Sequence, residues 1–134
     1  MKTISVAAAI IIKNDRILAT ERAKGDYRDM WEFPGGKLEP GESGEEAIVR
    51  EIREELDAEI KVDSYLTTVE YDYPTFHLSM KCYICSLVDE KIVLLEHEAM
   101  AWLEKEKLDS LKWLPADVLV VDELKRYLTS QVLR

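Results

Sequence analysis

The sequence contains little cysteine and little histidine, with two of each among 134 residues. Cys82 and Cys85 have the C-x-x-C spacing of redox and zinc motifs, but they fall in an extended run in which residues three apart point to opposite faces. No second cysteine or histidine pair accompanies them. We therefore interpret them as buried or half-buried free thiols, which suits a reducing cytoplasm.

Basic residues are also scarce. Eighteen Lys and Arg residues stand against 27 Asp and Glu residues, for a formal net charge of −9. This balance argues against a nonspecific binder of nucleic acid or of anionic membranes, because such binders need a basic surface. The excess acid is concentrated: residues 39–59 contain nine acidic residues and two arginines, a balance of −7, and the remaining 18 acids and 16 bases give only −2. That segment requires a chemical reason.

Long hydrophobic runs, repeats and low-complexity tracts are missing as well. The apolar run in residues 1–12 is too short for a membrane span, and no small-residue cleavage site follows it, so we interpret it as a buried strand. No linker divides the chain, which predicts a single domain over residues 1–134. A chain of this length buries a core without disulfides or a structural metal.

Short apolar runs separated by turn residues predict a fold dominated by strands. The expected strands cover residues 3–12, 16–21, 59–71, 76–88 and 99–103, and the expected helices cover residues 45–56 and the segment opened by Pro115. Residues 14–15 predict a hairpin turn, residues 23–30 a loop and residues 34–36 a break. The predicted core stripes of the helices are Ile48, Val49, Ile52 and Leu56, then Val118, Val121, Leu124 and Leu128. These elements indicate an α+β protein in which helices cover a mixed sheet.

The acidic segment coincides with the first predicted helix. At about 100° per residue, Glu51, Glu54 and Glu55 share an arc beside the core stripe, while Arg50 points elsewhere. Like charges at these spacings repel by roughly a few tenths of a kcal/mol per pair, so a face kept this negative favours a cation such as Mg²⁺ or Mn²⁺. A solvated acidic face is the alternative interpretation. Just upstream, the glycines at 35–36 let the backbone approach closely, which makes its carbonyls candidate ligands.

Gly36, Glu42 and residues 50–55 (REIREE) stand at the spacing G-x5-E-x7-R-E-U-x-E-E and resemble the Nudix box. The many fixed positions make this a specific signal. In the family pattern Glu42 and Arg50 form a structural ion pair between loop and helix. One position departs, because Asp57 stands where the family has a glycine. That glycine follows the helix in a left-handed conformation, which Asp tolerates, so we expect a slightly poorer helix cap and an intact metal site.

The resemblance covers nearly the whole chain. Similar segments of the MutT-like branch, which includes 8-oxo-dGTP diphosphatases and CTP pyrophosphohydrolases, match residues 31–37 (WEFPGGK), 70–74 (EYDYP), 96–102 (EHEAMAW) and 114–117 (LPAD). The likeness implies the Nudix fold, a mixed β-sheet sandwiched between α-helices. It also implies hydrolysis of a nucleoside diphosphate linked to a further group.

By this resemblance the box residues would form a divalent-metal site. The implied ligands for Mg²⁺, with Mn²⁺ as an alternative, are Gly36, Glu51, Glu54 and Glu55. Glu51 and Glu54 would also act in catalysis. A further carboxylate would complete the site or serve as base, and Glu98 is preferred over Glu96 for this role.

The remaining candidates concern the substrate. The resemblance implies a phosphate contact from Arg22, whose forked guanidinium suits phosphate oxygens, and Lys37 is a further cation; both have an equal alternative as surface charges. Asp117 occupies a position that faces the base, where a carboxylate accepts hydrogen bonds from amino groups, although it also suits a helix cap. His97 suits either a structural or a substrate role. The candidates to stack on or enclose the base are Phe33, Tyr73 and Phe76.

Together these features predict a Mg²⁺-dependent (deoxy)nucleoside triphosphate pyrophosphohydrolase that releases nucleoside monophosphate and pyrophosphate and sanitises oxidised or noncanonical nucleotides. Asp117 mildly favours cytosine nucleotides over 8-oxo-dGTP. The alternatives are a nucleoside diphosphate-sugar (ADP-ribose type) pyrophosphatase and a non-catalytic nucleotide-binding module. The expected partner is the nucleotide, without nucleic acid or membrane, and the protein is expected to be a cytoplasmic monomer or homodimer.

Overall fold

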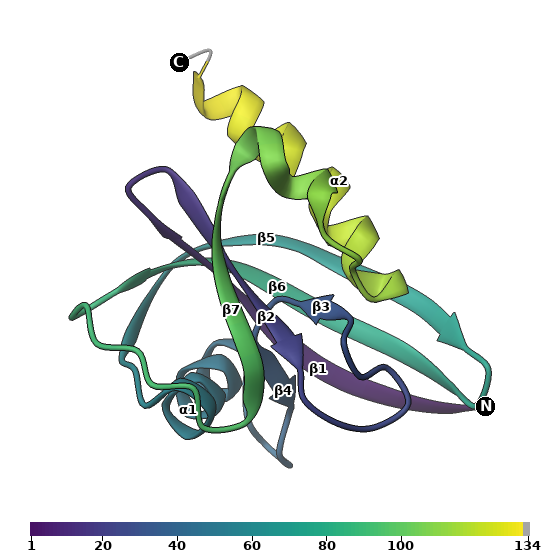
Figure 1. Cartoon of the computed structure of the whole chain (residues 1–134). Helices are drawn as coiled ribbons and strands as arrows, with labels where there is room; N and C mark the ends of the chain where they lie inside the picture. Colours follow the sequence, from purple (N-terminus) through teal and green to yellow (C-terminus); the bar gives the residue numbers. More distant parts are fainter. Residues whose placement is uncertain (133–134) are drawn as a thin grey trace.

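The computed structural model of the chain describes residues 1–132. Its elements in chain order (Figure 1) are β1 (Lys2–Lys13), β2 (Arg16–Arg22), β3 (Trp31–Glu32), β4 (Gly35–Lys37), α1 (Gly44–Leu56), β5 (Ile60–Tyr73), β6 (Phe76–Leu87), β7 (His97–Glu104), the 3-10 helix η1 (Lys105–Ser110) and α2 (Pro115–Val132). Neither α-helix within this described part is long and apolar enough to cross a membrane.

β1 is the central strand of the sheet. It runs parallel to β6, with Lys2 opposite Phe76 at one end and Ile11 opposite Cys85 at the other. β6 pairs antiparallel with β5, and β4 pairs antiparallel with the other edge of β1. The end of β1 turns into β2, which carries β3 and β7 as antiparallel neighbours. Parallel and antiparallel pairs share one sheet, so the prediction of a mixed sheet is confirmed.

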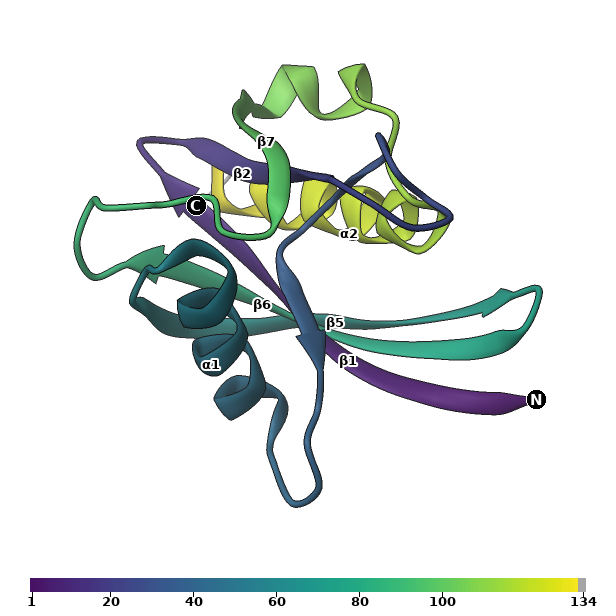
Figure 2. The same cartoon turned by 60° about the horizontal axis from the view of Figure 1, so that its bottom comes forward.

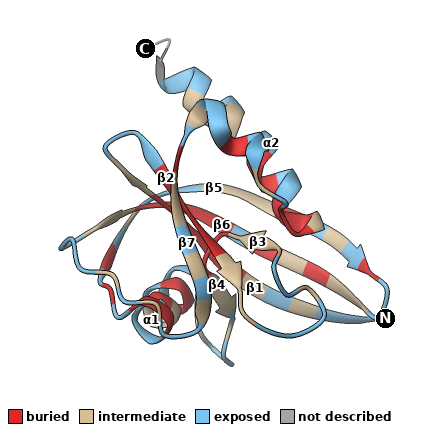
Figure 3. Ribbon diagram, viewed as in Figure 1, coloured by how far each residue is buried: buried red, intermediate tan, exposed pale blue. Residues whose placement is uncertain are grey.

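The two α-helices cover opposite faces of this sheet (Figure 2). Because successive strand residues point to opposite faces, Ala7 and Ala9 of β1 pack in the cluster with α1, while Ala8 and Ile10 pack in the cluster with α2. Buried residues concentrate on the central strands and on the sheet-facing sides of the helices (Figure 3). The predicted α+β sandwich is therefore confirmed.

The two cysteines follow the same alternation. Cys82 lies in the cluster on the α2 side and Cys85 in the cluster on the α1 side, and both are buried and free. Burial raises the pKa of each thiol above its usual range, because the apolar surroundings disfavour the thiolate. The interpretation of these residues as buried thiols is confirmed.

Local sequence fixes both ends of α1. The Ser43 hydroxyl accepts a hydrogen bond from the backbone N–H of Glu46 at 3.1 Å, and the Glu46 carboxylate accepts from the Ser43 N–H at 2.9 Å, which is a capping box. At the other end Asp57 adopts φ +49° and donates its backbone N–H to the carbonyl of Arg53. Asp57 thus takes the left-handed conformation expected at the position of the family's glycine.

Several local predictions are wrong in detail. Val49 and Val118, expected in the core stripes, are 36% and 46% exposed. The small side chains of Ala47 and Ala116 are buried against the sheet instead, which turns the valines toward solvent. The break predicted at residues 34–36 contains the start of β4, because glycine lets the chain lie directly against β1. β7 begins at His97, two residues earlier than expected.

Gly35 is the point at which β4 approaches β1 most closely. A Cβ atom at this residue would lie 2.0 Å from the carbonyl oxygen of Ala7 and 2.8 Å from the Cα of Ala8, both of which are backbone atoms that cannot rotate away. We expect Gly35→Ala to separate β4 from β1 and to lower the free energy of unfolding by about 2 kcal/mol or more, measured by urea unfolding.

Gly41→Ala is the control for this prediction. Gly41 has φ +79°, so a side chain is strained there, but no atom of the described residues lies within 4 Å of its Cβ position. Its replacement is expected to cost only about 1 kcal/mol. Equal losses in the two variants would contradict the close approach at Gly35.

Candidate active site

A cavity of about 570 Å³ is lined by residues of β1, β4, α1, β6 and the loop that follows β2. One part of its wall carries carboxylates, and another part carries aromatic and aliphatic side chains. Of the predicted site residues, the cavity wall contains Arg22, Phe33, Gly36, Lys37, Glu51, Glu55, Tyr73, Phe76 and Asp117. Glu54 and Glu98 are outside this wall. Most of the predicted site is therefore brought together in one place.

Gly36 and Glu51 are in close contact, which ties β4 to α1. A Cβ atom at Gly36 would lie 2.4 Å from the Cδ of Glu51. Glycine at this position therefore lets the backbone come against the carboxylate with no side chain between them. The residue whose carbonyl the resemblance implies as a ligand is therefore in direct contact with the Glu51 carboxylate.

Glu55 is a buried carboxylate on the sheet-facing side of α1. It is 5% exposed, and its Oε2 atom is buried without a hydrogen-bond partner among the described residues. Burial is the largest of the causes that raise the pKa of Glu55 to about 9, and the close carboxylate of Glu51 and the charges of Glu32 and Glu96 act in the same direction. A buried acceptor that lacks a donor costs roughly 1–3 kcal/mol, so this arrangement opposes folding unless a proton or a cation satisfies the carboxylate.

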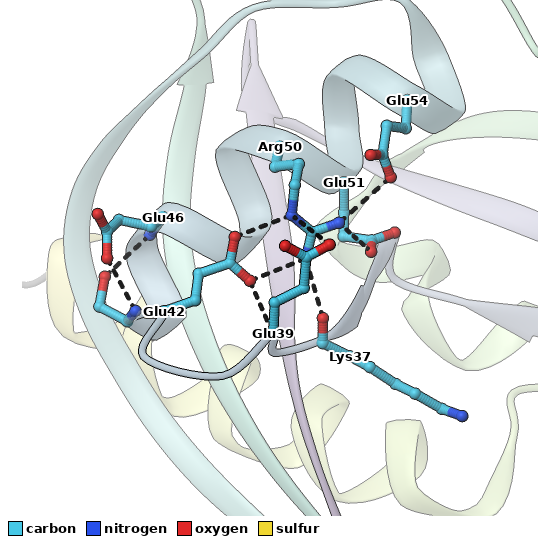
Figure 4. A network of polar contacts seen from close by, with 8 residues as sticks. Lys37, Glu39, Glu42, Glu46, Arg50, Glu51 and Glu54 are labelled. Carbon is cyan, nitrogen blue, oxygen red and sulfur yellow. Dashed lines mark hydrogen bonds and ion pairs between the residues drawn. The ribbon is translucent and has the colours of Figure 1, made fainter.

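Arg50 is the centre of the network in Figure 4. Its guanidinium donates to both carboxylate oxygens of Glu42 at 2.8 Å, to Glu51 at 2.7 Å and to Glu54 at 3.2 Å. It also donates to the carbonyl of Lys37 at 3.0 Å. The Glu42–Arg50 pair braces the loop against α1, and the hydrogen bonds from Arg50 lower the pKa of Glu42 to about 2. The expectation that Arg50 points away from the acidic face is wrong.

The three box glutamates are therefore not equivalent. Glu55 lies inside the protein, Glu51 lines the cavity with part of its carboxylate held by Arg50, and the Glu54 side chain is 56% exposed. Within residues 1–132, no three carboxylate, imidazole or thiol groups already stand close enough together to hold a metal ion. The groups that could hold a metal here, the Glu55 and Glu51 carboxylates and the Gly36 carbonyl, are all oxygen donors of the kind that Mg²⁺ prefers.

Glu32 joins two further side chains of the cavity wall. Its Oε1 accepts from the Arg22 guanidinium at 3.1 Å, and its Oε2 lies 3.2 Å from the Nε2 of His97. The same nitrogen of His97 lies 3.5 Å from the Oε1 of Glu55. Arg22 is thus linked to the buried carboxylate of α1 through two intervening residues.

Glu96 and Glu98 are separated by the start of β7. Glu96 lies in the bend before the strand and lines the cavity. Glu98 is exposed and outside the cavity wall, because neighbouring residues of a strand point to opposite faces and His97 points inward. This placement favours Glu96, and the preference for Glu98 is not supported.

Asp117 closes the apolar part of the cavity. Its Oδ1 accepts a hydrogen bond from the backbone N–H of Phe33 at 3.0 Å, so it fastens α2 to the segment before β4. Burial raises the pKa of Asp117 to about 8, although the Phe33 hydrogen bond acts in the opposite direction. A residue expected to face the base thus also stabilises the fold.

The aromatic candidates are packed against other rings. Phe33 stacks on Trp113 with the ring centroids 4.6 Å apart, and Tyr73 stacks on Phe76 at 5.1 Å. The Tyr73 hydroxyl accepts from the backbone N–H of Ala116 at 3.2 Å, which holds this ring beside the start of α2. These contacts give the apolar wall of the cavity a fixed shape.

Sequence reasoning missed several residues of the cavity wall. Glu32 carries a signal, since it is the acidic residue of the segment WEFPGGK, and its side chain is mostly buried. Tyr27 packs edge-on against Tyr73 at 5.5 Å, but its position in a polar loop gives no indication of this. Met80 faces the cavity from β6 and is indistinguishable from core residues in the sequence.

Comparison with known proteins identifies the class. The family model described as the NUDIX domain matches residues 1–131, and the chain belongs to the Nudix family of hydrolases. It is 33% identical to the CTP pyrophosphohydrolase of Escherichia coli over 91% of each chain. It is 31% identical to the 8-oxo-dGTP diphosphatase of the same organism over 94% of this chain and 99% of the relative. The sequence resemblance to the MutT-like branch is confirmed.

Solved structures agree with this assignment. The solution structure of the E. coli ORF135 protein superposes with a TM-score of 0.80 at 34% identity, covering 92% of this chain and 89% of that one. The MutT NUDIX hydrolase of Burkholderia pseudomallei has a TM-score of 0.83 at 23% identity, covering 92% and 98%. The second likeness concerns the fold alone.

The raised pKa of Asp117 predicts how stability depends on pH. Between about pH 4 and pH 8 the folded protein keeps a proton on Asp117 that the unfolded chain releases, so the stability falls as the pH rises. We expect urea unfolding at pH 5, 6 and 7 to show a smaller decline for Asp117→Asn than for the parent, by up to about 1.4 kcal/mol per pH unit. Asn retains an acceptor for Phe33. Parallel pH profiles would contradict the shift.

Proposed function

We propose that the protein is a Mg²⁺-dependent pyrophosphohydrolase of nucleoside triphosphates, which releases nucleoside monophosphate and pyrophosphate and removes oxidised or noncanonical nucleotides. The observation that carries this proposal is one cavity that joins a carboxylate-lined part to an aromatic part closed by Asp117. A nucleotide has the same division into a polyphosphate and a flat base. The named activities of the two E. coli relatives support this class of substrate.

The oxygen atoms of Glu51, Glu55 and the Gly36 carbonyl are the groups that would hold Mg²⁺. Glu54 would join them only after releasing Arg50. When bound, the ion would neutralise charge on the triphosphate and lower the pKa of the attacking water. Without it, the negative charge of this cavity would repel the substrate.

The chain's own residues would carry the remaining tasks. Arg22 and Lys37 lie in the cavity wall and would compensate the phosphate charge. Glu51 or Glu96 would accept the proton of the water that attacks phosphorus, since both carboxylates line the cavity. Attack of this water would break one phosphoanhydride bond, and the products would be nucleoside monophosphate and pyrophosphate.

Asp117 bears on the choice of base. A carboxyl with a pKa of about 8 is neutral at pH 7 and offers an O–H donor beside a carbonyl acceptor. Cytosine presents the complementary pair, a ring-nitrogen acceptor beside an amino donor. This match suits cytosine nucleotides, which we favour, although the O6 and N7–H of 8-oxoguanine present a similar acceptor–donor pair and the nucleotide panel decides between them.

A nucleotide panel tests the reaction and the base together. With Mg²⁺ present, we expect monophosphate and pyrophosphate from CTP, dCTP or 5-methyl-dCTP, with lower turnover of 8-oxo-dGTP and none in EDTA. Glu55→Gln should lower kcat/KM by about 100-fold or more, because it removes an anionic ligand. A failure to release pyrophosphate from every triphosphate would sink the proposal. Binding without turnover would indicate a nucleotide-binding module instead.

The two glutamates beside His97 provide a matched pair of variants. We expect Glu96→Gln to lower kcat by about 10–100-fold, because Glu96 lines the cavity. Glu98→Gln should change kcat by less than about threefold, since Glu98 is outside the cavity wall. Steady-state kinetics on the preferred nucleotide decide between them. The reverse ranking would return the role to Glu98.

The free, buried thiols of Cys82 and Cys85 suit a reducing compartment. We therefore place the protein in the cytoplasm, where nucleotides are found. Cell fractionation that recovered the protein outside the cytoplasmic fraction would contradict this location.

A further inference from the structure

His97 is a buried histidine in the cavity wall to which the reaction above gives no role. It opens β7 and stands opposite Arg22 of β2 in the strand register, so the two side chains point to the same face of the sheet. The register shifts here: Glu21 is opposite Ala99 and Arg22 is opposite His97, which leaves Glu98 as the extra residue of a bulge. Such bulges re-aim side chains, and this one turns His97 into the cavity.

Within residues 1–132, the Nε2 atom of His97 has polar contacts with two carboxylates. That nitrogen lies 3.2 Å from Glu32 Oε2 and 3.5 Å from Glu55 Oε1, and the side chain is 5% exposed. Because the carboxylate oxygen of Glu32 is an acceptor, we assign the imidazole proton to Nε2, which then donates to Glu32. The other oxygen of Glu32 accepts from Arg22. The result is a continuous chain of polar contacts from Arg22 to Glu55.

Three atoms in this series of polar contacts are buried without a hydrogen-bond partner among residues 1–132: Arg22 Nε, His97 Nδ1 and Glu55 Oε2. Buried polar groups in folded proteins nearly always have a hydrogen-bond partner. Three buried polar atoms without one in a single cavity wall therefore do not stabilise the fold. The Oε1 atom of Glu55 lies near His97, and its Oε2 atom has no partner in the described part of the chain. Glu55 itself lines the cavity. The arrangement suits a carboxylate held ready for a ligand.

We propose that His97 is a positioning residue for the reaction: its Nε2, which hydrogen-bonds Glu32, lies against the Glu55 carboxylate and fixes its position, and through Glu32 it sets the distance between that carboxylate and Arg22. The proposal rests on the proposed function, since it assigns Glu55 to the cation and Arg22 to the phosphates. Groups that orient a metal ligand typically change metal affinity or activity by about 10–100-fold when they are removed.

The chain offers a matched control. Its second histidine, His77, is also held by two carboxylates, with Nδ1 2.6 Å from Asp72 and Nε2 2.7 Å from Glu70. That cluster is on the exposed surface where β5 and β6 meet, and His77 is not in the cavity wall. A substitution of His77 therefore reports the general effect of losing a histidine that pairs with carboxylates.

The experiment compares four variants: His97→Leu, His97→Gln, His97→Asn and His77→Gln. Gln carries its amide N–H₂ at about the reach of Nε2, whereas Asn carries it at about the reach of Nδ1. For each variant, Mg²⁺ affinity is measured by calorimetric titration without nucleotide, and kcat and KM are measured on the preferred triphosphate. Urea unfolding confirms that the variants are folded.

We expect His97→Leu and His97→Asn to weaken Mg²⁺ binding and lower kcat by about tenfold or more, with KM changed much less. His97→Gln should recover most of both quantities, and His77→Gln should leave them unchanged. If His97→Leu does not fold, the comparison of Gln with Asn decides alone. Equal behaviour of Gln and Asn, or Mg²⁺ affinity and kcat within twofold of the parent in all His97 variants, would overturn the proposal.

The titration separates this proposal from the proposed function. If the parent protein hydrolyses no triphosphate, the proposed function fails, but the effect of His97 on Mg²⁺ affinity is still measured. If the parent is active and His97→Leu loses no Mg²⁺ affinity and no kcat, only the positioning role fails.

Discussion

The burial of the Glu55 carboxylate is the constraint on which the site depends. Hydrophobic packing of α1 against the sheet carries this side chain into the interior along with Ile48, Ile52 and Leu56. There it meets the carboxylates of Glu51 and Glu32, which raise its pKa in the same direction as burial does. The favourable packing of one helix face therefore holds an unfavourable group in place. A small cation that prefers oxygen ligands would compensate the buried carboxylate of Glu55.

The surrounding residues hold the Glu55 carboxylate at the cavity wall and stabilise the folded segment around it. Glycine at 36 lets β4 touch Glu51, and the capping box at Ser43 fixes the start of the helix. Arg50 supplies an internal positive charge, which it shares among Glu42, Glu51 and Glu54. Most of the repulsion in this acidic segment is compensated by the chain itself, and Glu55, where Arg50 makes no contact, is the exception. Glu55 is thus the box carboxylate that Arg50 does not compensate.

Much of this was predictable from the sequence, because strands and helices leave periodic patterns and the box has fixed spacing. The alternation of Cys82 and Cys85 and the left-handed Asp57 followed from local rules. The network of Glu32 and His97 did not, because a β-bulge sets it, and a bulge depends on pairing between distant strands. The same bulge explains why Glu98, rather than Glu96, ended outside the cavity. The unequal burial of the three box glutamates likewise depends on how the helix rotates on the sheet, which helical periodicity fixes only coarsely.

Stability measured with and without Mg²⁺ tests the central claim most directly. If Glu55 is a buried carboxylate that a cation satisfies, Glu55→Gln should be more stable than the parent in EDTA at neutral pH, because the parent must take up a proton at Glu55 on folding and the Gln variant need not. The parent should then gain stability as Mg²⁺ is added, by about 2.7 kcal/mol at a hundredfold excess over the dissociation constant, and Glu55→Gln should gain little. A parent that is more stable than Glu55→Gln in EDTA and insensitive to Mg²⁺ would contradict the account.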